Sequence, residues 1–362
     1  MLAAGCVAAA WWGPAQLWPT TAAPDGVYGR AGDGPSGLAL LSAQAEKGAL
    51  QADVPRPASA ASPPSPASPP VTAVAEPFLP EVAEAACTTL LPRLPGLSRA
   101  QCVATRLQAS GALSRQGAPL YWRDVPSQAG AAAKSQPAAE PLRVLVVGAM
   151  HGDELTAASL ALRWIGMAAA EGAVDADEPA PVHWRFIPVL NPDGLLAPKP
   201  TRVNAGGVDL NRNFPTPGWA EEAPVYWEKR TRKDPRRWPG HTPLSEPESR
   251  FLHQQMDQFQ PQLVVSIHAP YGVLDFDGPH DPPLRLGRLR MDKLGVFPGS
   301  LGHYGGLHRG VPVVTIELEH ALRMPPDAEV RAMWRDLRHW MNTRLLDGAD
   351  AVAGVKPPGL QR

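Results

Sequence analysis

The chain has 362 residues, a formal net charge of −1 and 44% hydrophobic residues. This length suits one large domain or two ordinary ones. The near-zero net charge gives no indication of a nucleic-acid partner, and no apolar run reaches the ~20 residues that a membrane-spanning helix needs.

Residues 1–85 are expected to form a disordered segment rather than a packed domain. The 43 prolines are far above average usage, and a dense Pro/Ala/Ser run extends from Pro55 to Pro80, which is typical of an extended linker. Two interpretations of the start stay open. Leu2-Ala3-Ala4-Gly5-Cys6 is similar to a bacterial lipoprotein processing site behind a truncated signal, which would make Cys6 a lipid anchor on a periplasmic or membrane-anchored protein. Otherwise it is an Ala-rich disordered N-terminus, and the protein could be cytoplasmic.

Residues 86–140 form a lead-in before the main domain. Cys87 and Cys102 flank a short helical stretch, and they form either a disulfide or two buried free thiols. We favour the disulfide, because the export-like start indicates an oxidising compartment and a loop of this size could contribute ~3 kcal/mol. Two short strands are expected around Gly117, followed by a loop over residues 127–140.

The main domain is expected over residues 141–350, with a tail at 351–362. Strand-like runs and helical periodicity alternate within it. Strands are predicted at 142–148, 183–190, 262–268 and 311–318, and helices at 154–168, 245–259, 284–294 and 326–346. Ser245 and Glu248 have the spacing of a capping box. The alternation predicts an α/β fold with a mixed, largely parallel central sheet flanked by helices.

Polar residues follow several of the predicted strands, where ligands bind in sheets of this kind. His151 follows the first strand, Glu154 begins the next helix, and His268 ends a third strand. Two imidazoles and a carboxylate can hold zinc and leave a fourth position open. The pair of His151 and Glu154 alone would be weak support, since such a pair is usually structural.

Two further features could act on a substrate. Asn211 and Arg212 lie in a glycine-containing loop, and an arginine beside an asparagine can hold a carboxylate through forked hydrogen bonds, although turn chemistry alone could explain them. Glu317 ends a very apolar strand, where burial would raise its pKa and suit it as a general base. Glu319 is a competing candidate on the same face.

Five motifs in this order, HGDE, LNPDG, GVDLNRNFP, SIHAP and TIELE, resemble the zinc carboxypeptidase A-like family over roughly residues 110–345. The resemblance implies a zinc carboxypeptidase-like fold and a metallocarboxypeptidase with one zinc ion per chain. It implies His151, Glu154 and His268 as metal ligands, and Glu317 as the base that activates water and protonates the leaving amine. It also implies that Arg202 stabilises the oxyanion and that Asn211 and Arg212 bind the terminal carboxylate of the substrate.

Within that family, the chain is most similar to the amidases that cut bacterial murein peptides at the γ-D-glutamyl–diaminopimelate bond. The expected partner is therefore a small, cell-wall-derived peptide, bound partly by the polar stretch Leu301–Arg309. Tyr304 is our candidate for a substrate-contacting tyrosine, with Tyr271 as the alternative. Three other functions stay open: a zinc acylase of the desuccinylase or aspartoacylase type, a broad exopeptidase for ordinary L-peptides, and a lipid-anchored cell-wall-binding protein without activity.

Overall fold

The structure is a computed structural model, and it describes residues 79–127, 140–171 and 181–345. The expectations about Cys6, residues 128–139 of the predicted loop and the tail at 351–362 fall outside the described residues, as does the Pro/Ala/Ser run except for its last two residues. Pro80 begins a helix, Pro80–Leu90, so residues 80–85 are helical and the predicted end of the disordered segment at residue 85 was wrong. Among the helices that are described, none combines the length and the apolar character that crossing a membrane would require.

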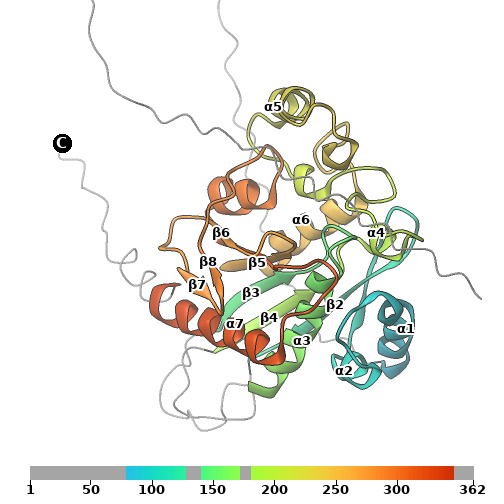
Figure 1. Ribbon diagram of the computed structural model, residues 1–362, viewed down its shortest axis with the longest axis vertical. Coiled ribbons are helices and arrows are strands. Elements are labelled where there is room, and N and C mark those ends of the chain that lie inside the picture. The colour runs from blue at the N-terminus through green and yellow to red at the C-terminus, as the bar shows by residue number, and fades with distance from the viewer. Residues whose placement is uncertain (1–78, 128–139, 172–180, 346–362) are drawn as a thin grey trace, which may run out of the picture. The chain divides into compact units, whose positions relative to one another are not determined.

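A seven-stranded sheet in the order β1-β2-β4-β3-β5-β9-β6 forms the centre of the described chain (Figure 1). Its strands are β1 (Gln108–Leu113), β2 (Pro119–Val125), β3 (Leu142–Val147), β4 (Val182–Ile187), β5 (Leu263–His268), β6 (Leu274–Asp277) and β9 (Val313–Glu317). The four central strands β4, β3, β5 and β9 run parallel, while β2 pairs with β4 and β6 with β9 in the antiparallel sense. This confirms the predicted mixed, largely parallel sheet.

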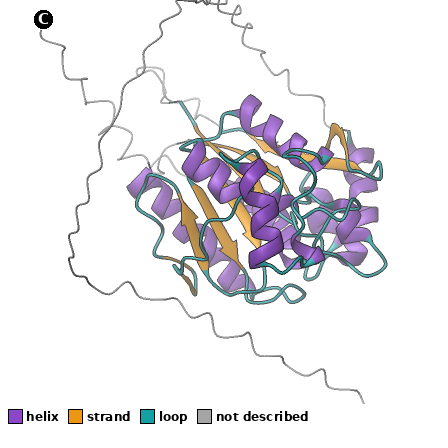
Figure 2. Cartoon of the chain, turned by 90° about the horizontal axis from the view of Figure 1, so that it is seen from above, coloured by secondary structure: helices purple, strands orange, loops and turns teal. Residues whose placement is uncertain are grey.

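Helices cover both faces of the sheet, and Figure 2 shows the strands enclosed between them. The α-helices are α1 (Pro80–Leu90), α2 (Arg99–Ala104), α3 (Leu155–Glu171), α4 (Pro192–Leu196), α5 (Trp219–Val225), α6 (Pro247–Phe259) and α7 (Asp327–Trp340). Shorter 3₁₀ turns lie at Leu91–Arg93, Leu210–Arg212 and Pro235–Arg237, and π-helical turns at Tyr226–Arg230, Gly302–His308 and Met341–Leu345.

The two cores follow from the alternation of side chains along each strand. Val144 and Val146 of β3 pack with α3 and α7 on one face, where Trp164 and Trp334 meet edge to face. Leu145 and the other alternate residues of β3 pack against α6 on the opposite face. Because both faces are buried, the parallel strands read as nearly continuous apolar runs, and all four were therefore predicted to within a few residues.

The lead-in contributes to the same sheet. Gly117, at φ 84°, lies in the turn between β1 and β2, which are the two short strands expected there. Residues 123–125 of β2 then pair with β4, so the hairpin extends the parallel sheet by two strands. Cys87 of α1 and Cys102 of α2 form the expected disulfide, with both side chains buried.

The structure corrects the predicted capping box. Helix α6 begins after Glu246, whose side chain makes no capping hydrogen bond, and Pro247 occupies its first turn. The carboxylate of Glu248 instead accepts a hydrogen bond from the backbone N–H of Arg115. A capping box does begin α2. The side chain of Ser98 accepts a hydrogen bond from the backbone N–H of Gln101, and the side chain of Gln101 accepts one from the backbone N–H of Ser98.

The helix predicted at 284–294 is absent, and this prediction was wrong. The segment forms a small hairpin of β7 (Arg285–Leu286) and β8 (Leu289–Arg290). Gly287 in its turn has φ 57°, a conformation that favours glycine. Its backbone N–H donates to Asp336 on α7. The apolar residues of this segment fit a two-residue turn as well as a helical stripe, so periodicity could not separate the two structures.

Candidate metal centre

Two turns at the carboxyl ends of β3 and β4 build the floor of the site. The first carries His151 and the second begins at Asn191, whose side-chain oxygen accepts a bond of 2.9 Å from the N–H of Gly194. Gly152 and Gly194 bring the turns into backbone contact, because a Cβ atom on Gly152 would collide with the backbone of Gly194. The two glycines therefore fix where His151 lies relative to the neighbouring strand end.

The predicted ligands His151, Glu154 and His268 converge on one point. The Nδ1 atom of His151 lies 2.8 Å from Oε1 of Glu154, and Nδ1 of His268 lies 3.0 Å from Oε2 of the same carboxylate. The two Nδ1 atoms are 3.1 Å apart. All three side chains are buried, with at most 5% of their surface exposed, and their ligand atoms lie within 4.8 Å of one another.

The hydrogen bonds on the far side of each ring show that this donor set fits a cation. Nε2 of His151 lies 3.1 Å from Oδ1 of Asp209, a carboxylate that can only accept, so Nε2 carries the ring proton. Nε2 of His268 lies 2.9 Å from the hydroxyl of Ser266. In the neutral form that binds metals, with the proton of each ring on Nε2, both Nδ1 lone pairs would face the carboxylate of Glu154. Three converging acceptors repel one another unless a cation lies between them, and outer bonds of this kind are typical of metal-bound histidines.

The carboxylate of Glu154 is ionised in this setting. Burial alone would raise its pKa, but the charges and hydrogen bonds of His151 and His268 outweigh burial and hold the pKa well below its usual range. A buried, ionised carboxylate between two imidazoles is a good ligand for zinc.

Asp209 is a site residue that sequence reasoning missed. Its buried carboxylate contacts His151 through Oδ1, and through Oδ2 it accepts bonds of 3.0 and 2.9 Å from Nε and NH2 of Arg202. Despite burial, the charges of Arg202 and His151 hold its pKa well below the usual value. The only signal in the sequence was its position two residues before Asn211 in the GVDLNRNFP motif.

Arg202 lies beside the proposed ligands, as the resemblance implied. Its NH1 atom is 3.2 Å from Nδ1 of His151 and 3.7 Å from Oε1 of Glu154. The paired carboxylate of Asp209 holds the guanidinium in this position. The cation is therefore fixed next to the point where the three ligands meet, and it can stabilise negative charge that develops there.

A buried network holds the loop that carries Asp209. The amide oxygen of Asn204 accepts from the backbone N–H groups of Gly206 and Val208. Its amide nitrogen donates 2.8 and 3.0 Å bonds to the carboxylates of Glu246 and Glu248. These bonds join the loop to the start of α6.

Glu317 lies next to His268, since the two residues are register partners at the ends of β9 and β5. Only 7% of its surface is exposed, and its Oε2 atom has no hydrogen-bond partner among the described residues. Burial, followed by the nearby charge of Glu154, raises its pKa to about 8. The competing candidate, Glu319, lies beyond the end of the strand and is exposed.

Arg212 is buried with incomplete pairing. Its guanidinium stacks 4.5 Å from the ring centroid of Phe297, and NH1 donates to the backbone oxygen of Asn211 at 2.6 Å. Its Nε atom has no partner among the described residues, and burial lowers its pKa to about 10. The side chain of Asn211 accepts from the backbone N–H of Leu301 at 2.8 Å. A buried cation with a donor left unpaired among the described residues is suited to bind an anionic group.

The two candidate tyrosines differ in accessibility. Tyr304 is 2% exposed and stacks on Phe214, and its hydroxyl is bonded to His253 and to Arg309. Arg309 in turn pairs with Asp257, so these polar groups of the predicted pocket stretch bind one another. Tyr271 is 59% exposed and its backbone N–H bonds to Glu317. Its side chain is the one available to a ligand.

Comparisons with known proteins show the family of the chain. Residues 104–277 match the model of the zinc carboxypeptidase family. The chain belongs to this family. Murein peptide amidase A of Vibrio campbellii is 32% identical over 193 residues, which are 49% of this chain and 69% of that protein. Murein peptide amidase A of Escherichia coli K12 is 34% identical over 164 residues, 44% of this chain. That match spans only 57% of the E. coli protein's length.

The solved structures support the fold. Carboxypeptidase A of Helicoverpa armigera superposes with a TM-score of 0.51 at 15% sequence identity, and the match covers 76% of this chain and 81% of that chain. At this identity the likeness shows the shared architecture of a mixed sheet between helices.

Proposed function

We propose that this protein is a zinc-dependent metallocarboxypeptidase that releases the C-terminal residue of small murein peptides by cutting the γ-D-glutamyl–diaminopimelate bond. The observation that carries the peptidase proposal is the convergence of His151, Glu154 and His268 beside Glu317, a buried carboxylate with one oxygen unpaired in the described part of the chain. Membership of the zinc carboxypeptidase family supports zinc as the metal, with one ion per chain.

His151, Glu154 and His268 would hold the zinc ion. When bound, zinc supplies a Lewis acid that polarises the scissile carbonyl and lowers the pKa of water. Glu317 removes a proton from the attacking water and transfers it to the leaving nitrogen, a role that suits a pKa near neutrality. Arg202 stabilises the negative charge on the carbonyl oxygen, and Asp209 keeps Arg202 and His151 in place.

Arg212 would bind the terminal carboxylate of the substrate. Its buried guanidinium has an Nε without a partner among the described residues, so an incoming carboxylate would supply an acceptor there. Asn211 would assist through its amide nitrogen, since its amide oxygen already accepts from Leu301. This contact selects peptides with a free C-terminus and places their last bond next to Glu317.

The murein substrate is supported by the two curated relatives, both named murein peptide amidase A. The metal ligands and Glu317 alone would serve an ordinary exopeptidase or an acylase equally well. The polar stretch Leu301–Arg309 offers a substrate side chain fewer free groups than its sequence indicated, because Tyr304 and Arg309 bind each other.

A comparison of substrates tests the proposal. Purified, zinc-loaded protein should hydrolyse L-Ala-γ-D-Glu-diaminopimelate with a kcat/KM at least tenfold above that for dipeptides ending in Phe, Leu, Lys or Arg. N-acetyl and N-succinyl amino acids serve as acylase substrates in the same assay. Preference for an ordinary dipeptide would leave only the carboxypeptidase chemistry, and release of acetate or succinate would indicate an acylase.

A further inference from the structure

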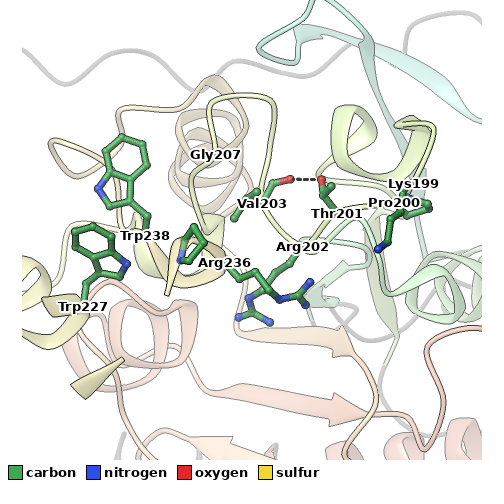
Figure 3. A pocket seen from close by; sticks show the side chains of 10 residues that line it. Lys199, Pro200, Thr201, Arg202, Val203, Gly207, Trp227, Arg236 and Trp238 are labelled. Carbon is green, nitrogen blue, oxygen red and sulfur yellow. Dashed lines mark hydrogen bonds between the residues drawn. The ribbon is translucent and has the colours of Figure 1, made fainter. Parts of the chain in front are cut away.

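A cavity of about 580 Å³ lies beside Arg202 (Figure 3). Residues 199–203 form one wall, and a second wall comes from the segment that carries Trp227 and Trp238. In Figure 3, Lys199 stands across the cavity from the two indoles, with Arg202 between them. Sequence reasoning assigned no role to these residues other than Arg202.

The cavity reaches the metal centre through Arg202. This side chain lines the cavity, and its NH1 atom lies 3.2 Å from Nδ1 of His151. Neither Asn211 nor Arg212 is among the lining residues. The cavity is therefore separate from the site proposed for the terminal carboxylate. A peptide bound across the metal centre, with its C-terminus at Arg212, would place the residues before the scissile bond at Arg202 and in this cavity.

Two hydrogen bonds fix the wall opposite Lys199 to the catalytic elements, and a third holds the wall segment together. The backbone oxygen of Trp238 accepts from the N–H of Asp209 at 2.8 Å. The guanidinium of Arg236 donates to Asp153 in the HGDE turn at 2.8 Å. The indole of Trp227 donates to the backbone oxygen of Asp234 at 2.7 Å. The cavity is consequently preformed, as binding sites for small ligands usually are.

The charges around the cavity favour an anion. Its lining includes Lys199, Arg202 and Arg236 but no carboxylate. Arg202 and Arg236 already pair with Asp209 and Asp153. Lys199 is exposed and has no acidic partner among the described residues. The cavity thus offers, on one side, an ammonium group that no described carboxylate pairs with, and two indole rings on the other.

We propose that this cavity binds the acyl portion of the substrate and that Lys199 recognises a free carboxylate in it. The inference rests on the proposed function. A γ-linked glutamyl residue keeps its α-carboxylate free directly before the scissile bond, whereas an ordinary α-linked residue does not. The preceding alanine would contact the indoles of Trp227 and Trp238. Lys199 is then a specificity-determining residue for γ-linked peptides.

Paired substrates and variants test the role of Lys199. We compare L-Ala-γ-D-Glu-diaminopimelate with the analogue whose glutamyl α-carboxylate is an amide. The native protein should prefer the acid by about tenfold in kcat/KM. Lys199→Gln should remove most of this preference, because it should lower kcat/KM for the acid and not for the amide. Lys199→Arg should restore the preference. Lys229→Gln, at an exposed position outside the cavity, is the matched control and should keep the preference.

A binding measurement separates this inference from the proposed function. Calorimetry gives the Kd of L-Ala-D-Glu, the acyl product of the proposed cleavage, for the native protein, for Lys199→Gln and for Lys199→Glu. Binding that is weaker by tenfold or more in the variants supports the cavity site. If the same protein hydrolyses no murein peptide, that second result refutes the proposed function and leaves the cavity site supported. Equal Kd values, or an unchanged acid preference in Lys199→Gln, would overturn the cavity site even if murein hydrolysis is observed.

Discussion

Glu317 and His268 are paired in register across two neighbouring parallel strands, and each is the last residue of its strand. Register partners project from the same face of a sheet. The separation between the proposed base and the metal centre is therefore set by strand pairing rather than by a flexible loop. Substitutions at Glu317 that keep the shape of the side chain should leave the metal ligands in place.

Glu317→Gln should lower kcat by at least ~10²-fold, the usual contribution of a positioned general acid–base group, with about one zinc ion retained per chain. The amide can neither take a proton from water nor give one to the leaving amine. Steady-state kinetics together with metal analysis checks both parts. Glu319→Gln is the matched control, because Glu319 is exposed beyond the end of the strand. Near-normal turnover in Glu317→Gln, with loss in Glu319→Gln, would reverse the assignment.

Asp209→Asn should weaken zinc binding by about 10- to 100-fold, because Asp209 orients His151 from behind. The same change releases Arg202, so kcat should fall even at saturating zinc. Zinc affinity is measured by competition with a chromogenic chelator. Asp153→Asn is the control: it removes a carboxylate from the turn that carries His151. Among the described residues Asp153 pairs only with the exposed Arg236, so the zinc affinity should not change. Unaltered affinity in Asp209→Asn would show that the contact does not support the metal.

Glu317 should make a contribution to the stability of the metal-free protein that decreases as pH rises. Its pKa is about 8 in the folded chain and ~4.3 in an unfolded chain. The unfolded state therefore releases this proton first, so the contribution of Glu317 is complete below about pH 4 and is lost by pH 8.

Urea unfolding of the metal-free native protein and of Glu317→Gln, at several pH values, measures this effect. The glutamine cannot ionise, so the variant should gain stability relative to the native protein by on the order of a few kcal/mol between pH 4 and pH 8. Other groups titrate in both proteins and cancel in the difference. A difference that does not change with pH would show that Glu317 is not held neutral by burial.

Arg212→Ala should raise the barrier for substrates with a free terminal carboxylate by about 2–4 kcal/mol, the scale for loss of one partner of a buried charge pair. For substrates amidated at the C-terminus, the barrier should rise much less. Steady-state kinetics on the acid and the amide gives both values, and circular dichroism confirms that the variant folds. Arg230→Ala, at an exposed position, is the control. Equal losses on the acid and the amide would mean that Arg212 has only a structural role.

Strand ends were the most predictable part of this molecule. His151, His268 and Glu317 each follow or end an apolar run of a buried parallel strand, and ligands gather at the carboxyl ends of such strands. The sequence alone therefore placed three site residues on one edge of the sheet. The register that pairs His268 with Glu317 needed the structure.

Loops and side-chain partners were less predictable. The role of Asp209 depends on a turn held by Asn204 and on Arg202, and neither contact leaves a periodic signal in the sequence. Tyr304 seemed accessible because its neighbours are polar, but its hydroxyl is bonded to His253 and Arg309 within the fold. The segment around Gly287 likewise had the periodicity of a helix, but it forms a hairpin.

The pairing of β2 with β4 also determines where a recombinant fragment of this protein can begin without exposing a strand of the sheet. A chain shortened to start at Leu142 would keep all the proposed metal ligands but would leave the backbone of β4 without a neighbour on one side. Open strands of this kind recruit further strands from other molecules and favour aggregation. Recombinant fragments should therefore retain the hairpin of β1 and β2 and, because Cys87 lies in α1, should begin before Pro80.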